Sequence, residues 1–185
     1  MCEIIKNEVL FHTIFNRDIV IPIWAIFEIL SLGEFGTLFD CASTKVKLYV
    51  SKIMKLPTNL DSDGNITKIF IFTLKDLRNA IAHNNVIFDT RFKTGKIDKR
   101  LVGLLEKELE IHNINFNYMD AYVSMITYFL IRMGETKDLC ERFILEYQEQ
   151  TEELRNELPS NVCNQILGTQ HRSNMEAIKK FIFKV

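Results

Sequence analysis

The scarcity of helix breakers is the feature that most constrains the fold of this chain. Only 3 prolines and 7 glycines occur among 185 residues, whereas 14 phenylalanines supply bulk for a core. Such a sequence favours helices over a many-stranded sheet, because strands need frequent turns. With 47% hydrophobic and 25% charged residues, the composition is that of an ordinary globular protein. The sequence therefore predicts an all-α fold, a helical bundle.

Apolar residues recur at helical spacing in the segments where helices are expected. The clearest case is residues 66–83, where Phe70, Leu74, Leu77 and Ile81 follow one stripe and are expected to face the core. A segment that is apolar nearly all round is expected to be central. This central segment is residues 118–133. Further helices are predicted at residues 22–32, 45–55, 101–111 and 135–158, with a short helix or turn at 34–39 and one or two short helices within 160–185.

Turn-forming residues mark where these helices begin and end. Pro22 suits the first turn of a helix, and Gly33 is expected to close that helix as a left-handed cap. Residues 57–65 form the clearest loop and are interpreted as a linker rather than a calcium loop, because no glutamate closes the run of acids. Pro159 is expected to end the long helix before it.

These boundaries suggest three parts of the chain. Residues 1–18 read as a lead-in segment, residues 19–158 as the helical domain, and residues 159–185 as a C-terminal extension of uncertain structure.

Several classes of protein are disfavoured by composition. The net charge of −1 argues against a surface coated with basic residues for non-specific nucleic-acid binding. The four cysteines are scattered without a paired motif, so free thiols are expected and no metal site is predicted. No secretory signal and no apolar run of membrane-spanning length is visible, so we expect a cytoplasmic protein without a membrane partner.

A group of polar residues interrupts the apolar pattern at residues 77–85. Asn79 and His83 are four positions apart and share a helix face opposite the apolar stripe, while Arg78 projects from the flank. This places His83 away from the core. A structural explanation is available for each: a histidine at a helix C-terminus complements the dipole, and a flanking arginine often forms a surface ion pair.

Two motifs together resemble a known family. Arg78 and His83, with the polar Asn79 directly after the arginine, resemble the R-x4-6-H signature of the HEPN superfamily. Residues 22–33 resemble the P-x-W-x-x-x-E-x-x-S-x-G segment of abortive-infection (Abi) proteins of the AbiD/AbiF type, a phage-defence family within HEPN. The two motifs follow in the family's order, and the resemblance covers residues 19–133.

The resemblance implies a HEPN-like helical bundle, here with additional C-terminal helices, and a metal-independent endoribonuclease without a cofactor. Attack of a ribose 2′-OH on the adjacent phosphorus needs a base, an acid and positive charge. His83 is the candidate acid or base, Arg78 binds the phosphate, and Asn79 orients either group. Since one protomer supplies one such histidine, a homodimer that shares the site is expected. An antitoxin, protein or RNA, is a possible further partner.

Three further residues are candidates for supporting roles. Glu28, within the apolar first helix, is a candidate to contact and fix Arg78; a solvent-facing glutamate is the alternative. Arg91 and Lys93 lie in a basic loop and are candidates to line the RNA path, with a plain solvated loop as the alternative. The three other histidines, His12, His112 and His171, lack companions in the sequence and are interpreted as incidental.

Two other functional classes remain open. A non-catalytic HEPN-fold RNA-binding or scaffold protein would use Arg78 only to hold phosphate. In a helical adaptor, the motif would be purely structural.

Overall fold

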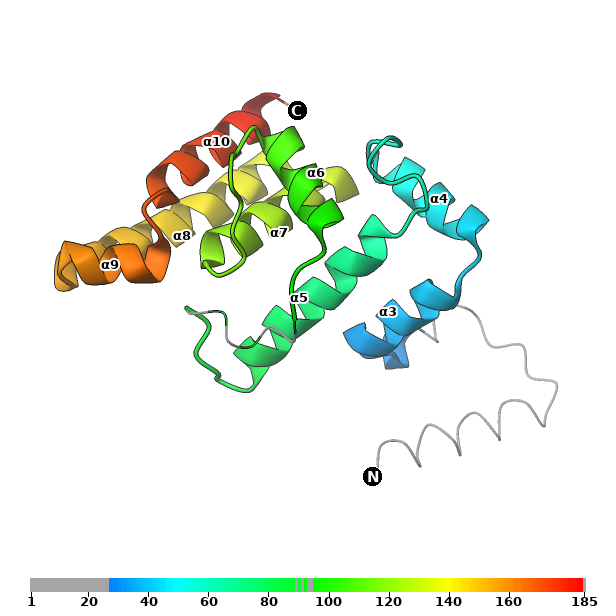
Figure 1. The fold of residues 1–185 in the computed structure, drawn as a ribbon, viewed down its shortest axis with the longest axis horizontal. Helices are drawn as coiled ribbons and strands as arrows, with labels where there is room; N and C mark the ends of the chain where they lie inside the picture. The colour runs from blue at the N-terminus through cyan, green and yellow to red at the C-terminus, as the bar shows by residue number, and fades with distance from the viewer. Residues whose placement is uncertain (1–26, 89, 91, 93–94, 185) are drawn as a thin grey trace.

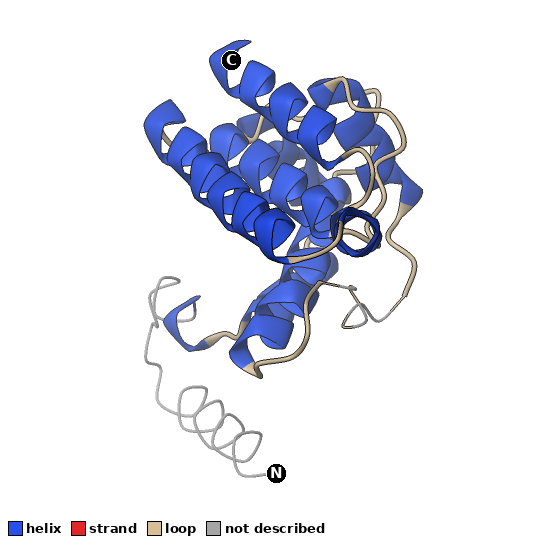
Figure 2. Cartoon of the chain, turned by 90° about the vertical axis from the view of Figure 1, so that its left-hand side faces the viewer, coloured by secondary structure: helices blue, strands red, loops and turns tan. Residues whose placement is uncertain are grey.

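The computed structural model describes residues 27–88, 90, 92 and 95–184, and within these residues every regular element is a helix (Figures 1 and 2). This confirms the predicted all-α fold. The helices are α3 (Leu32–Cys41), α4 (Thr44–Ile53), α5 (Ile66–Ala82), α6 (Lys99–Leu109), α7 (Met119–Met133), α8 (Lys137–Glu157), α9 (Ser160–Leu167) and α10 (His171–Lys184).

Helix α5 links two groups of helices. On one side it packs against α3 and α4, and on the other against α6 and α7 (Figure 1). Helix α10 returns to pack on α6, α7 and α8. The rings of Phe70 on α5 and Phe129 on α7 stack with their centroids 3.8 Å apart. This aromatic contact joins the motif-bearing helix to the C-terminal helices.

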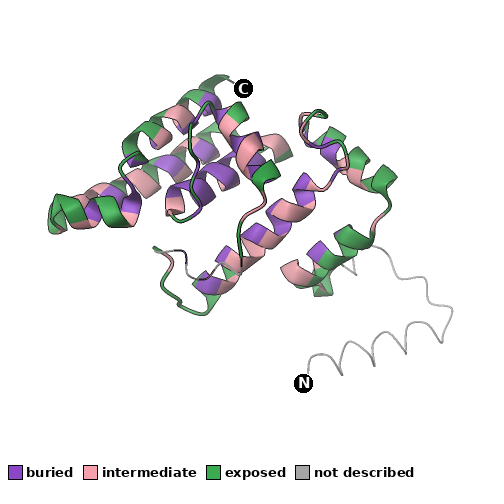
Figure 3. Cartoon of the chain, in the orientation of Figure 1, coloured by how far each residue is buried: buried purple, intermediate pink, exposed green. Residues whose placement is uncertain are grey.

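Helix α7 is the centre of the second group, as its all-round apolar pattern predicts. Tyr122, Met125, Tyr128 and Phe129 are fully buried. Figure 3 shows α7 as largely buried and the loop that follows α5 as exposed. None of the helices in the described part of the chain is both long enough and apolar enough to cross a membrane.

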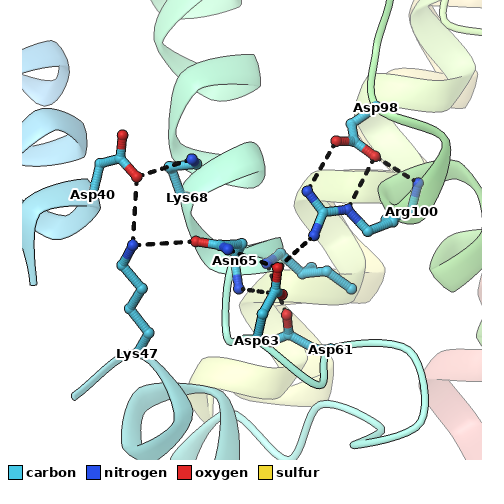
Figure 4. Close-up of polar contacts among 9 residues, drawn as sticks. Asp40, Lys47, Asp61, Asp63, Asn65, Lys68, Asp98 and Arg100 are labelled. Atoms are coloured by element: carbon cyan, nitrogen blue, oxygen red, sulfur yellow. Dashed lines mark hydrogen bonds and ion pairs between the residues drawn. The ribbon is translucent and has the colours of Figure 1, made fainter. Parts of the chain in front are cut away.

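The predicted linker at residues 57–65 connects α4 to α5 and is held by polar contacts (Figure 4). Buried Asp61 accepts a hydrogen bond from the backbone N–H of Ile66 over 2.9 Å, at the start of α5. Gly64 has a φ of +70°, and a Cβ there would lie 2.6 Å from the backbone carbon of Lys47. Only glycine fits this close approach to α4.

Arg100, in the first turn of α6, ties this loop to the second group of helices. Its guanidinium donates to Asp63 over 2.8 Å and to Asp98 over 3.2 Å (Figure 4). Hydrogen bonds from Arg100 lower the pKa of the Asp98 carboxyl, and those from Asn65 and Arg100 lower the pKa of Asp63.

The expectation for Gly33 is wrong. Gly33 lies in the first turn of α3, which begins immediately after Ser31. The Ser31 hydroxyl accepts from the Glu34 N–H over 3.3 Å, and the Glu34 carboxylate accepts from the Ser31 N–H over 2.7 Å. This reciprocal capping box starts a helix, and it outweighs the tendency of glycine to end one. The predicted start of the preceding helix at Pro22 lies outside the described residues.

The expectation that Ile81 faces the core is also wrong. Phe70 and Leu77 are buried, but Ile81 is 55% exposed. Residues 81–86 are all exposed, so the last turn of α5 extends beyond the packed helices. The apolar stripe therefore continues along α5 beyond the point where other helices cover it.

The thiols of Cys41, Cys140 and Cys163 are free, as expected, with the last two buried. Cys2 lies outside the described residues.

Candidate functional site at the end of helix α5

Helix α5 ends within the polar motif. His83 is the C-cap residue, and its backbone N–H donates to the Asn79 carbonyl over 3.0 Å. Asn84 follows with a φ of 52°, a left-handed conformation that asparagine tolerates better than most residues. The motif therefore lies on the last turn of a helix and just past it, as predicted.

Arg78 and Asn79 are in direct contact. The Arg78 Nη1 donates to the Asn79 Oδ1 over 3.1 Å. Arg78 is exposed and forms no ion pair with any described residue. One donor is used to fix the side chain, and the remaining guanidinium N–H groups are available to a ligand.

His83 is exposed and lies one turn beyond Asn79. Its imidazole has no hydrogen-bond partner within the part of the chain that the structure describes. The structure thus joins Arg78 to Asn79 by side chains, and joins Asn79 to His83 through the backbone alone. An exposed imidazole without an internal partner is free to contact a ligand or a second protein chain.

The supporting candidates are placed differently. Glu28 is exposed, and no contact between it and Arg78 is found among the described residues. This position agrees with the solvent-facing alternative. Arg91 and Lys93 lie outside the described residues, so their expected roles remain predictions.

Large apolar side chains close to the motif in sequence are exposed. Ile81, Val86 and Phe88 are 55%, 61% and 49% exposed. Exposed large apolar side chains so close in sequence make this end of α5 a candidate for contact with another surface.

The loop after α5 is anchored on α7 further along. The ring of Phe92 lies 5.3 Å from the ring of Tyr122, and Tyr122 contacts Phe116 at 5.0 Å. Burial raises the pKa of the Tyr122 phenol, and the negative charge of Asp76 on α5 adds to this shift. Tyr122 is therefore a neutral, buried anchor for the segment that leaves the motif.

A buried polar cluster lies near the start of α10, and no local sequence pattern predicts it. The His171 Nδ1 lies 2.7 Å from Asp120 Oδ1, and its Nε2 lies 3.0 Å from the Thr151 hydroxyl. The Tyr147 hydroxyl donates to the same Asp120 oxygen over 3.0 Å, and burial together with the Asp120 charge raises the Tyr147 pKa.

The interpretation of His171 as incidental is therefore wrong. Its side chain is 1% exposed and has two partners. Asp120 and His171 are 51 residues apart, and no local pattern relates them. Only the packing of α10 on α7 and α8 brings them together. Their burial and their hydrogen bond to each other identify them as a structural cluster that joins α7 to α10.

Comparison with known proteins places the motif within a family region. The model of the Abi-like protein family matches residues 3–89, a range that includes Arg78, Asn79 and His83. No curated protein and no solved structure matches the chain. Over residues 3–89, the chain is therefore similar to the Abi-like protein family.

Proposed function

We propose that this protein is a metal-independent endoribonuclease of the abortive-infection type, a member of the HEPN superfamily that acts in phage defence. The observation that carries the proposal is the arrangement of Arg78, Asn79 and His83 at the exposed end of α5. The match to the Abi-like family supports the biological setting, because that family is associated with abortive infection.

The state of Arg78 suits phosphate binding. Arg100, Arg132 and Arg172 each pair with a carboxylate. Arg78 has no such partner among the described residues, so its positive charge is not neutralised within the protomer. A planar guanidinium can donate two parallel hydrogen bonds to phosphate oxygens, and Asn79 limits the orientations that it adopts.

His83 is the proposed acid or base of the cleavage. As a base, an imidazole takes the proton of the ribose 2′-OH while that oxygen attacks the adjacent phosphorus and the bond to the 5′ oxygen breaks. The same type of group, when protonated, returns a proton to the leaving 5′ oxygen. Among the described residues, one protomer offers only one exposed histidine at this site, so a second protomer would supply the other proton-transfer group.

The apolar residues around the motif support a homodimer as the active form. Burial of Ile81, Val86 and Phe88 against a second copy would remove these exposed side chains from water, a favourable term of about 1.5–3 kcal/mol for each fully buried large side chain. A two-fold contact at the end of α5 would also bring two Arg78–His83 pairs into one cleft. A growth-arresting nuclease has to be restrained between infections, so an antitoxin, protein or RNA, is the proposed second partner.

RNA cleavage by purified protein in EDTA tests the proposed function. Wild type should degrade RNA and slow growth when expressed, and His83→Ala should abolish both effects. His112→Ala is the matched control, since His112 is an exposed histidine on the loop between α6 and α7. Equal growth of wild type and His83→Ala, with no RNA degradation by either, would refute the nuclease. RNA binding that depends on Arg78 but leads to no cleavage would instead establish the non-catalytic RNA-binding alternative.

Analytical ultracentrifugation at micromolar concentration tests the dimer. Wild type should sediment as a dimer, and Ile81→Glu should shift it to a monomer because a charge would be buried at the interface. Leu145→Glu, at a position on α8 that is 42% exposed, is the control and should leave the dimer intact. A strictly monomeric wild type would rule out a site shared between two chains.

A further inference from the structure

A small polar pocket lies where α7 and α10 both begin. Its volume is about 210 Å³, and its lining includes the carboxamides of Asn113, Asn115, Gln170 and Asn174 together with Tyr118 and Asp120. Pockets for drug-sized ligands and cofactors measure roughly 300–1,000 Å³. This pocket is therefore of a size for one small group, and its carboxamides offer both donors and acceptors.

Asp120 gives the pocket an unsatisfied acceptor. Both hydrogen bonds to its carboxylate, from His171 and Tyr147, involve Oδ1. The other oxygen, Oδ2, is buried and has no hydrogen-bond partner among the described residues. A buried carboxylate oxygen without a donor is costly, so a donor from outside the chain would relieve a penalty that already exists.

Aromatic contacts join the loop after α5 to the segment that forms one wall of the pocket. Phe92, on the loop that leaves α5, contacts Tyr122, and Tyr122 contacts Phe116. Phe116 lies between two pocket residues in sequence, Asn115 and Tyr118, and Tyr122 directly follows the lining residue Ala121. The segment that contributes Asn115 and Tyr118 to the pocket is thus packed, through Phe116, against Tyr122.

We propose that this pocket binds one nucleobase of the RNA, a base that carries an exocyclic amino group. This inference rests on the proposed RNA substrate, but it concerns a site separate from Arg78, Asn79 and His83. Adenine, cytosine and guanine each have an amino group that can donate to a carboxylate, whereas uracil has none. The carboxamides can pair with the other edge atoms of the base, and the Tyr118 ring offers an aromatic surface for stacking.

Calorimetric titration of the full-length His83→Ala protein with nucleoside 5′-monophosphates tests the pocket without cleavage. AMP, CMP or GMP should bind at least about tenfold more tightly than UMP, because a buried charged acceptor without its donor costs about that factor. Ribose 5-phosphate, which has the phosphate but no base, should bind no better than UMP. Equal binding of all four nucleotides, or of ribose 5-phosphate, would mean that the base is not recognised.

Substitutions in the lining locate the binding. Asn174→Leu should reduce binding of the preferred nucleotide at least tenfold, since it fills the pocket and removes a hydrogen-bonding group. Asn156→Leu makes the same change at an exposed position on α8 outside the pocket and should leave binding unchanged. Gln170→Leu, at an exposed lining residue just before α10, provides a second variant in case Asn174→Leu fails to fold.

The outcomes separate this inference from the proposed nuclease function. Unaltered nucleotide binding by Asn174→Leu and Gln170→Leu, or no nucleotide binding at millimolar concentration, would overturn the pocket even if wild type cleaves RNA. Selective binding that both lining variants abolish would establish the pocket even if no cleavage occurs.

Discussion

Arg78 donates a hydrogen bond to the side chain of Asn79 over 3.1 Å and contacts no carboxylate within the described residues. Adjacent residues on a helix diverge by about 100° and seldom meet, so this contact depends on the long stem of the arginine bending back. It leaves a positive charge with a fixed direction at the surface. Such an exposed charge can bind a ligand, but it contributes little to the stability of the protomer.

The first prediction follows from this contact. Arg78→Ala should change the free energy of unfolding by no more than about 0.5 kcal/mol, since exposed substitutions of this kind have small effects. The same change should lower the RNA cleavage rate at least about 100-fold, the usual effect of removing a donor to transition-state charge. Thermal unfolding and initial cleavage rates measure the two effects. Arg142→Ala, on the exposed side of α8, is the control for both. A large loss of stability in Arg78→Ala would indicate a structural arginine instead.

The second prediction concerns the shared site. Arg78→Ala and His83→Ala should each be inactive alone, and a mixture in which subunits exchange should regain part of the activity. The mixed dimer would hold one intact arginine from one chain and one intact histidine from the other in the same cleft; because it has one proton-transfer histidine instead of two, only part of the rate should return. Cleavage assays before and after subunit exchange measure the recovery. No recovery, in mixtures where exchange is demonstrated by mass spectrometry, would mean that each Arg78–His83 pair works within its own chain.

The third prediction concerns Arg100 and pH. The folded-state pKa values of Asp63 and Asp98 are lowered, so their stabilising contribution is present above the unfolded pKa of about 3.9 and is lost as pH falls through the lower folded values. Arg100→Gln should therefore lower the unfolding free energy at pH 7, by up to about 1 kcal/mol, since these groups are partly exposed. The difference from wild type should shrink as pH falls below about 3.9, and it should also shrink in 1 M salt.

Urea unfolding at pH 7 and pH 2 measures this difference. Arg172→Gln is the comparison, because among the described residues Arg172 pairs with Glu152 on the surface of the same helix group and with no other carboxylate. A deficit of Arg100→Gln that persists unchanged at pH 2 would show that packing of the arginine stem, and not its charge, holds the loop.

The fourth prediction concerns the buried cluster. His171→Ala should lower the unfolding free energy by about 3 kcal/mol, because it removes one partner of a buried charged group and leaves Asp120 with only Tyr147. His112→Ala, an exposed histidine, should change it by less than about 0.5 kcal/mol. Chemical denaturation of both variants is the measurement, and equal stability of the two would mean that His171 contributes no more than a surface residue.

Local patterns in the sequence were sufficient for the helices and for the position of the motif. The stripe of Phe70, Leu74 and Leu77 defines the buried side of α5, and the opposite side therefore carries Asn79 and His83. The end of α5 at residues 82–83 also follows from local chemistry, because asparagine readily adopts the left-handed conformation that stops a helix. The capping box of Ser31 and Glu34 is also visible in the sequence, but Gly33 between them favours the end of a helix and led to the opposite prediction.

Tertiary packing decided the exposure of Ile81 and the pairing of Asp120 with His171. Periodicity tells which residues of α5 share a face, but it does not tell where the covering helices stop, so Ile81 and Phe70 look equivalent in sequence. Likewise, a carboxylate and an imidazole 51 residues apart become partners only when α10 packs across α7 and α8. The physical reason is the same in both cases. Secondary structure depends on neighbours along the chain, whereas burial and long-range hydrogen bonds depend on which surfaces meet in space.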